Sequence, residues 1–105
     1  MQISNFALYA RGGENIFPRE IEEILHAHPR ILEAAVIGLP DPDWGEKVHA
    51  VVALKEGETL TEQEVIDYCK EHIASFKKPK SVEFVEKLPR SAAGKVLKRI
   101  LREGR

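Results

Sequence analysis

Hydrophobic residues recur at helical spacing in the first third of the chain. The stripe follows the i, i+3, i+4, i+7 pattern of an amphipathic helix and consists of Ile21, Ile24, Leu25 and His28. Pro18 suits the first turn of this helix, because its missing N–H would be unpaired there, and Pro29 stops the helix. We therefore predict one helix between these two prolines. Residues 6–10, upstream of it, can form a short strand.

Strand-like patterns occupy three further stretches of the chain. Residues 31–39 form an almost continuous apolar run rich in β-branched side chains, which favours a buried strand. Residues 47–54 and 81–86 instead alternate apolar and polar positions, so that Val82 and Phe84 share one face and Val85 the other. Between these two strands a capping box opens a second helix at Thr61 and Glu64. Its inward residues are Val65, Ile66, Cys69 and Ile73.

A last, basic helix is predicted near the end of the chain. We expect its apolar residues Leu97, Ile100 and Leu101 to pack, and its charged residues Lys98, Arg99 and Arg102 to face solvent. The elements then follow the order αββαβα, with the short N-terminal strand in addition. This order predicts an α+β fold, a small three-stranded sheet with helices packed on it.

The composition is that of an ordinary globular domain, with 43% apolar residues in a chain of 105. No apolar run is long enough to span a bilayer and no signal-peptide pattern is present, so we expect a soluble, cytoplasmic protein without a membrane span. The charge is uneven: residues 1–76 hold 6 Lys/Arg against 14 Asp/Glu (−8), and residues 77–105 hold 10 against 3 (+7). The basic end either faces an anionic group or neutralises the rest of the fold.

The residues needed for several kinds of chemistry are missing or wrongly spaced. His26 and His28 would face different directions on a helix, and His49 and His72 are isolated, so we expect no metal site. No Ser–His–Asp, Cys–His or paired-carboxylate arrangement is visible. The single cysteine, Cys69, occupies an apolar helical position and is expected in the core.

Three features remain that one ligand could use together. The Gly12-Gly13 pair permits a close backbone approach, although it lacks the spacing of a P-loop. Trp44 and Phe76 offer flat apolar surfaces for a base, or serve as packing anchors. Lys78 and Lys95 offer positive charge. Lys95 lies in a turn-rich loop immediately before the basic helix, whose N-terminal N–H groups favour an anion; the alternative is a solvated loop lysine.

Five short motifs follow one another along the chain, and in this order and spacing they resemble a known family. They are Gly12-Gly13-Glu14-Asn15-Ile16-Phe17-Pro18-Arg19-Glu20-Ile21-Glu22, Ala35-Val36-Ile37-Gly38-Leu39-Pro40-Asp41, Trp44-Gly45-Glu46, Phe76-Lys77-Lys78-Pro79 and Leu88-Pro89-Arg90-Ser91-Ala92-Ala93-Gly94-Lys95. The family is the C-terminal domain of the adenylate-forming acyl-CoA synthetases, the AMP-binding ligases. The resemblance places this domain at residues 12–105 and leaves residues 1–11 as a poorly defined N-terminal segment.

The resemblance implies a division of labour between two domains. A large N-terminal domain binds ATP with Mg²⁺ and a carboxylic acid, and the small domain closes over it. Lys95 then reaches the carboxylate oxygen and the ATP phosphates, and it is the implied catalytic residue for acyl-adenylate formation. The small domain next rotates and presents its opposite face for thioester formation with CoA. The implied CoA contacts are Gly12 and Gly13 at the pantetheine, and Trp44, Phe76 and Lys78 at the nucleotide end.

Two departures from the family pattern leave a second interpretation open. The family's segment before the glycine loop carries a hinge residue and a basic residue, whereas this chain has Ile3-Ser4 and Phe6-Ala7 at those places. The 105 residues also leave no room for ATP and acid sites, so we expect an N-terminal adenylation domain in cis or in trans. The alternative is a catalytically inactive remnant or an interaction or CoA-binding module. Nucleic-acid binding ranks last and is not expected, because the acidic remainder would repel a phosphate backbone.

Overall fold

The computed structural model describes residues 8–9, 15–43, 45–73, 77–103 and 105. Its elements are β1 (Leu8–Tyr9), β2 (Asn15–Ile16), α1 (Pro18–His26), β3 (Ile31–Asp41), β4 (Gly45–Leu54), α2 (Glu62–His72), β5 (Ser81–Val85) and α3 (Lys98–Arg102). From α1 onward this is the predicted αββαβα order, and the predicted α+β fold class is confirmed. β1 lies within the predicted short strand, and β2, which pairs antiparallel with it, is not predicted by the hydrophobic pattern.

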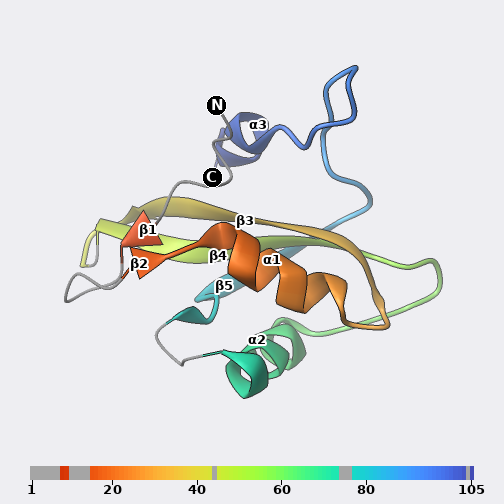
Figure 1. Cartoon of the computed structure of the whole chain (residues 1–105), viewed down its shortest axis with the longest axis horizontal. Helices are drawn as coiled ribbons and strands as arrows, with labels where there is room; N and C mark the ends of the chain where they lie inside the picture. Colours follow the sequence, from red (N-terminus) through yellow and green to blue (C-terminus); the bar gives the residue numbers. More distant parts are fainter. Residues whose placement is uncertain (1–7, 10–14, 44, 74–76, 104) are drawn as a thin grey trace.

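The main sheet has the strand order β3-β4-β5 (Figure 1). β3 and β4 form an antiparallel hairpin whose register runs from the Ile31–Leu54 pair to the Asp41–Gly45 pair. β5 is parallel to β4, with His49 opposite Ser81 and Ala53 opposite Val85. A parallel neighbour requires a crossover connection, which α2 provides.

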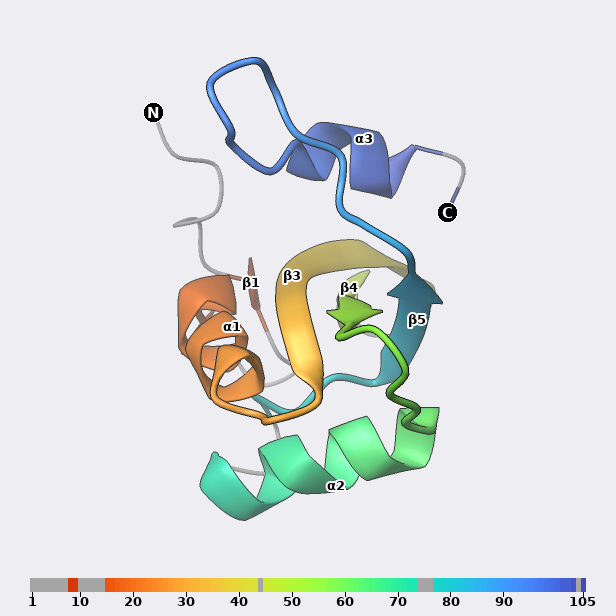
Figure 2. The same cartoon turned by 90° about the vertical axis from the view of Figure 1, so that its right-hand side faces the viewer.

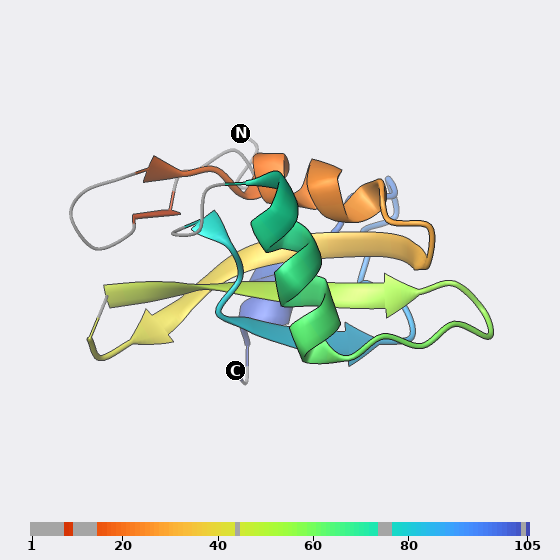
Figure 3. The ribbon, with the colours of Figure 1, turned by 90° about the horizontal axis from the view of Figure 1, so that it is seen from below.

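The sheet is covered on both faces, and each face has its own core (Figure 2). Because successive side chains of a strand point to opposite faces, Val36 packs in one core and Ile37 in the other. Helices α1 and α2 pack in the first core, and Figure 3 shows α2 crossing in front of the strands, α1 alongside β3 and α3 behind the sheet. The short α3 and the segment after β5 cover the second face through Leu88 and Leu101. Two covered faces explain why the β3 sequence reads as a continuous apolar run.

Helix α1 also covers the outer edge of β3. The carboxylate of Glu22 accepts a hydrogen bond from the Val36 N–H at 2.8 Å, and His26 Nε2 accepts one from the Ala34 N–H at 3.1 Å. These two backbone donors would otherwise be open to pairing with another strand. Side chains of α1 therefore satisfy this stretch of the edge.

The capping box predicted for α2 is confirmed, whereas α1 is shorter than predicted. Thr61 Oγ1 accepts from the Glu64 N–H at 3.1 Å, and the Glu64 carboxylate accepts from the Thr61 N–H at 2.8 Å, as the capping box predicts. Helix α1 ends at His26, two residues earlier than its stripe predicts, so His28 lies in the turn that follows. Hydrogen bonds in that turn, from the Ala27 and His28 N–H groups to the last carbonyls of the helix, close it before Pro29.

The predicted orientation of the last helix is wrong at two positions. Lys98, expected in solvent, is only 7% exposed, and its Nζ lies 2.6 Å from Glu22 Oε2. Ile100, expected to pack, is 39% exposed. The reason is that α3 has five residues and turns Lys98 and Leu101, three positions apart, toward the fold. An acidic partner on α1 then makes the buried ammonium tolerable.

Candidate functional site

Lys95 lies in a narrow loop between β5 and α3 that projects away from the sheet (Figure 1). The two limbs of the loop meet in an isolated antiparallel bridge between Arg90 and Val96. The Ser91 N–H donates to the Lys95 carbonyl at 2.8 Å, and the Leu97 N–H donates to the Pro89 carbonyl at 2.9 Å. The loop is therefore a small hairpin with defined limbs.

Ser91 and Gly94 close the tip of this hairpin. The Ser91 hydroxyl oxygen accepts from the Ala93 N–H at 3.2 Å and from the Lys95 N–H at 3.3 Å, while the Ser91 carbonyl accepts from the Gly94 N–H at 2.9 Å. Gly94 has φ +87°, a value that residues with a Cβ rarely adopt. A serine followed three residues later by glycine therefore builds the turn that presents Lys95.

The Lys95 side chain is exposed, and within the described part of the chain it forms no ion pair or side-chain hydrogen bond. Two residues, Val96 and Leu97, separate it from α3, because Val96 is extended and pairs with Arg90. Lys95 is thus presented by the hairpin, and the helix begins two residues later than the predicted start immediately after Lys95. An ammonium presented in this way can contact an external anion.

The base of the hairpin is held in the second core. Leu88 is 3% exposed and packs with Leu101 and Ile37, and Val96 is partly buried against the same cluster. Beside it lies a pocket of about 520 Å³, lined by His26, Leu32, Glu33, Ala34, Leu88, Arg90 and Val96. The tip of the Lys95 hairpin is therefore exposed, whereas its base is buried.

Four of the other predicted site residues, Gly12, Gly13, Trp44 and Phe76, lie outside the described residues. Lys78 is half-buried and precedes β5, whereas Lys95 follows β5. The structure therefore places these two lysines beyond opposite ends of one strand and does not bring them together. A strand of five residues is about 16 Å long.

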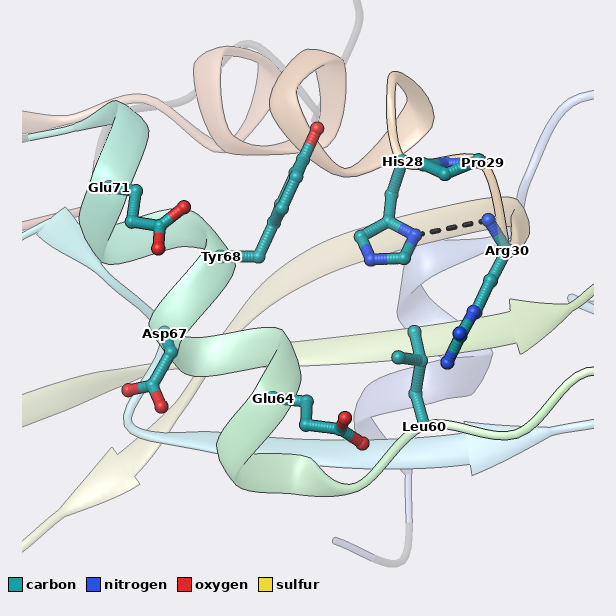
Figure 4. A pocket seen from close by; sticks show the side chains of 8 residues that line it. All are labelled: His28, Pro29, Arg30, Leu60, Glu64, Asp67, Tyr68 and Glu71. Carbon is teal, nitrogen blue, oxygen red and sulfur yellow. Dashed lines mark hydrogen bonds between the residues drawn. The ribbon is translucent and has the colours of Figure 1, made fainter.

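A second pocket, of about 460 Å³, lies between α2 and the turn after α1 (Figure 4). Its polar lining is mainly acidic, from Glu64, Asp67 and Glu71, and the His28 and Tyr68 rings meet edge to face at 4.6 Å. Burial lowers the pKa of His28, and Arg30 lowers it further, whereas Glu64 opposes this change. The Arg30 N–H donates to His28 Nδ1 at 3.0 Å, which fits a neutral ring. Helix α2, which lines this pocket, lies on the opposite side of the sheet from the loop between β5 and α3 that carries Lys95 (Figure 2).

A polar network on β4 and β5 also escapes the sequence patterns. His49, 7% exposed, contacts the Ser81 hydroxyl at 2.7 Å through Nδ1 and the Glu83 carboxylate at 3.1 Å through Nε2. Arg105 donates to the same carboxylate. The Arg105 guanidinium, with a smaller contribution from His49, lowers the pKa of Glu83 to about 2. The parallel pairing of β4 and β5 brings His49 beside Ser81 and Glu83, and Arg105 reaches Glu83 from beyond α3, so no local pattern marks this network.

Among the residues that the structure describes, no three His, Cys, Asp or Glu side chains converge as a metal site would require. The same residues contain no helix long and apolar enough to cross a bilayer.

A family model for the AMP-binding enzyme C-terminal domain matches residues 20–95, a range that ends at Lys95. The chain therefore belongs to the family of AMP-binding enzyme C-terminal domains, as its five motifs predict.

Individual relatives agree with this assignment. The chain is 50% identical over 96 residues to the mitochondrial medium-chain acyl-CoA ligase of Danio rerio, covering 91% of this chain and 16% of that protein. It is 46% identical, also over 96 residues, to the oxalate–CoA ligase of Saccharomyces cerevisiae, covering 91% of this chain and 18% of the relative. The crystal structure of ATP-bound MatB from Rhodopseudomonas palustris matches with a TM-score of 0.87 and 43% identity, over 94% of this chain and 20% of the other. The chain thus spans a fifth or less of each of these three proteins.

Proposed function

We propose that this chain is the mobile C-terminal domain of an ATP-dependent acyl-CoA ligase, with Lys95 as the adenylation lysine. The observation that carries the proposal is the hairpin: its tip presents an exposed lysine without an ion-pair partner among the described residues, and its base is buried. The relatives named as acyl-CoA ligases support the reaction class, and their greater length supports a separate N-terminal domain as partner, in cis or in trans.

The chemistry expected of Lys95 is electrostatic. When a carboxylate attacks the α-phosphate of ATP, negative charge is redistributed toward the departing pyrophosphate. An ammonium placed at these oxygens stabilises that charge, and more strongly where domain closure has excluded water. Lysine suits this task because it is a compact point charge on a flexible stem.

The second half-reaction needs a different face of the domain. We propose that Gly12, Gly13, Trp44, Phe76 and Lys78 contribute to the CoA site, as the family resemblance implies. Lys78 precedes β5 and Lys95 follows it, which supports this division. A rotation of the domain would withdraw the Lys95 end of the strand from the reaction site and bring the Lys78 end toward it. ATP with Mg²⁺ and CoA are then substrates of the complete enzyme, and a cytoplasmic location stays a prediction.

A chimera tests the proposed function directly. In it, this chain replaces the matching C-terminal segment of the Danio rerio medium-chain acyl-CoA ligase, and octanoate serves as the medium-chain fatty acid. We expect octanoyl-CoA formation that depends on ATP and CoA, above the rate of the relative's N-terminal part alone. A chimera that folds, as judged by its thermal unfolding, but forms neither octanoyl-AMP nor octanoyl-CoA would contradict the proposal.

The alternative, an inactive remnant or a CoA-binding module, is motivated by Ile3-Ser4 and Phe6-Ala7 where the family carries its hinge. It predicts an inactive chimera. Calorimetric titration of the chain with CoA then separates a CoA-binding module, which releases heat, from a remnant that does not.

A further inference from the structure

The Arg90 side chain links the Lys95 hairpin to strand β3. Its Nη1 donates a hydrogen bond to the Gly94 carbonyl at 2.8 Å, on the limb that carries Lys95. Its Nη2 is ion-paired with Glu33 Oε1 on β3. One guanidinium therefore connects the residue next to Lys95 with the edge strand of the sheet.

Glu33 is the anchor of this connection. Its side chain is 17% exposed, and its second oxygen, Oε2, accepts a hydrogen bond from the Leu88 N–H at 3.3 Å. Glu33 thus holds the first limb of the hairpin through the Leu88 backbone and the second limb through Arg90. Leu88 itself is buried, so the carboxylate lies where the hairpin enters the core.

An arginine is required for this geometry. The guanidinium is a planar fork whose separate amino groups can donate in different directions at the same time. A lysine at position 90 keeps the positive charge, but it offers one compact ammonium in place of two separated donor groups. The exchange of Arg90 for lysine therefore removes the bridge between Gly94 and Glu33 without removing the charge.

From this arrangement we propose that Arg90 and Glu33 are positioning residues for Lys95. They hold the Gly94–Lys95 segment at a fixed distance from β3, so that the ammonium enters the reaction site in one orientation. This inference rests on the proposed function of Lys95. It adds that the rate of adenylation depends on a contact that touches neither ATP nor the acid.

The experiment uses the chimera with the Danio rerio ligase and compares Arg90→Lys with Arg99→Lys. Arg99 is exposed on the neighbouring helix α3 and makes the matched control, since the same exchange there removes no contact in the described part of the chain. Adenylation is measured by octanoate-dependent exchange of pyrophosphate into ATP, and thioester formation is measured separately from synthetic octanoyl-AMP and CoA. In the isolated chain, the backbone ¹⁵N heteronuclear NOE reports order at Gly94 and Lys95.

We expect Arg90→Lys to slow adenylation by about 10- to 100-fold, because a displacement of about 1 Å can have an effect of that size. The thioester step should stay within about twofold of the wild type, since a contact to Lys95 is not used there. The heteronuclear NOE at Gly94 and Lys95 should fall. Glu33→Gln should slow adenylation in the same direction, and Arg99→Lys should change neither step.

Three results would overturn the inference. If Arg90→Lys leaves adenylation unchanged while Lys95→Ala abolishes it, the positioning role is wrong and the proposed function stands. If Arg90→Lys slows both steps equally, Arg90 has only a structural role. If Lys95→Ala leaves adenylation unchanged, the proposed function itself is wrong, and Arg90 and Glu33 then have no catalytic lysine to position.

Discussion

Removing one partner of the buried ion pair between Lys98 and Glu22, as in Lys98→Met, should strongly destabilise the fold. Lys98 Nζ, with its side chain 7% exposed, lies 2.6 Å from Glu22 Oε2, whose side chain is 15% exposed. Glu22 is the one ion-pair partner of this ammonium among the described residues, where no group accepts a well-directed hydrogen bond from it. The pair joins α1 to α3 across the edge of β3. Methionine keeps much of the volume and removes the charge, so Glu22 is left as an uncompensated carboxylate.

The magnitude follows from the burial of both partners. Breaking a buried pair by removing one partner costs about 3–5 kcal/mol, and the partial exposure of Glu22 favours the lower end, about 3 kcal/mol. For a domain of this size about 1 kcal/mol shifts Tm by at least 4 °C, so we expect Tm to fall by about 12 °C or more. Replacing both residues, as Lys98→Met with Glu22→Gln, should restore at least about half of the loss, because no uncompensated charge remains.

Thermal and urea unfolding followed by circular dichroism measure these changes. Arg99→Met is the matched control on the same helix, where an exposed residue should change the free energy of unfolding by less than about 0.5 kcal/mol. If Lys98→Met is no more destabilising than Arg99→Met, the buried pair does not hold α3 to α1. If the double variant is less stable than Lys98→Met, the reasoning from an uncompensated charge is wrong.

Three further predictions concern other parts of the fold. Gly94→Ala and Gly57→Ala each place alanine at positive φ and should each lower the free energy of unfolding by about 1 kcal/mol, but only Gly94→Ala should slow adenylation in the chimera. Arg105, with a smaller contribution from His49, lowers the pKa of Glu83 from 4.5 to about 2. The Glu83 carboxylate therefore stabilises the fold above pH 4.5, and this contribution is lost as pH falls toward 2. The stability difference between wild type and Glu83→Gln should close over that range, and a constant difference would contradict this prediction. Burial raises the pKa of Cys69 to about 11, so a thiol reagent at pH 8 should react slowly with the native chain and rapidly in urea; equal rates would show that the thiol is accessible.

Local signals carry the part of the fold that can be predicted from the sequence. The capping box depends on two residues three positions apart, and both of its hydrogen bonds form as expected. Pro18 occupies the first turn of α1 for an equally local reason. Alternation of apolar residues likewise places Val82 and Val85 toward different cores, although Phe84 at the same edge is 38% exposed. Features that a few neighbouring residues decide can therefore be derived without tertiary structure.

Long-range contacts decide the remainder. No acidic residue lies within four positions of Lys98, and its partner Glu22 lies on a helix far away in sequence. The same holds for the Glu33 carboxylate, which meets Arg90 only after the hairpin packs beside β3. In the candidate site, Lys95 can be selected from its motif, whereas the residues that hold it cannot. Such pairs have no periodic signature, so they become visible only in the folded chain.

The proposed role of Lys95 is tested most directly by Lys95→Ala in the chimera, with the two half-reactions measured separately. The account predicts that octanoyl-AMP formation falls by about 10²-fold or more, as removal of one preorganised electrostatic group does. Octanoyl-CoA formation from supplied octanoyl-AMP should continue at the rate of the unsubstituted chimera, because the rotated domain no longer presents this lysine. Unchanged adenylation, or an equal loss in both half-reactions, would contradict the account.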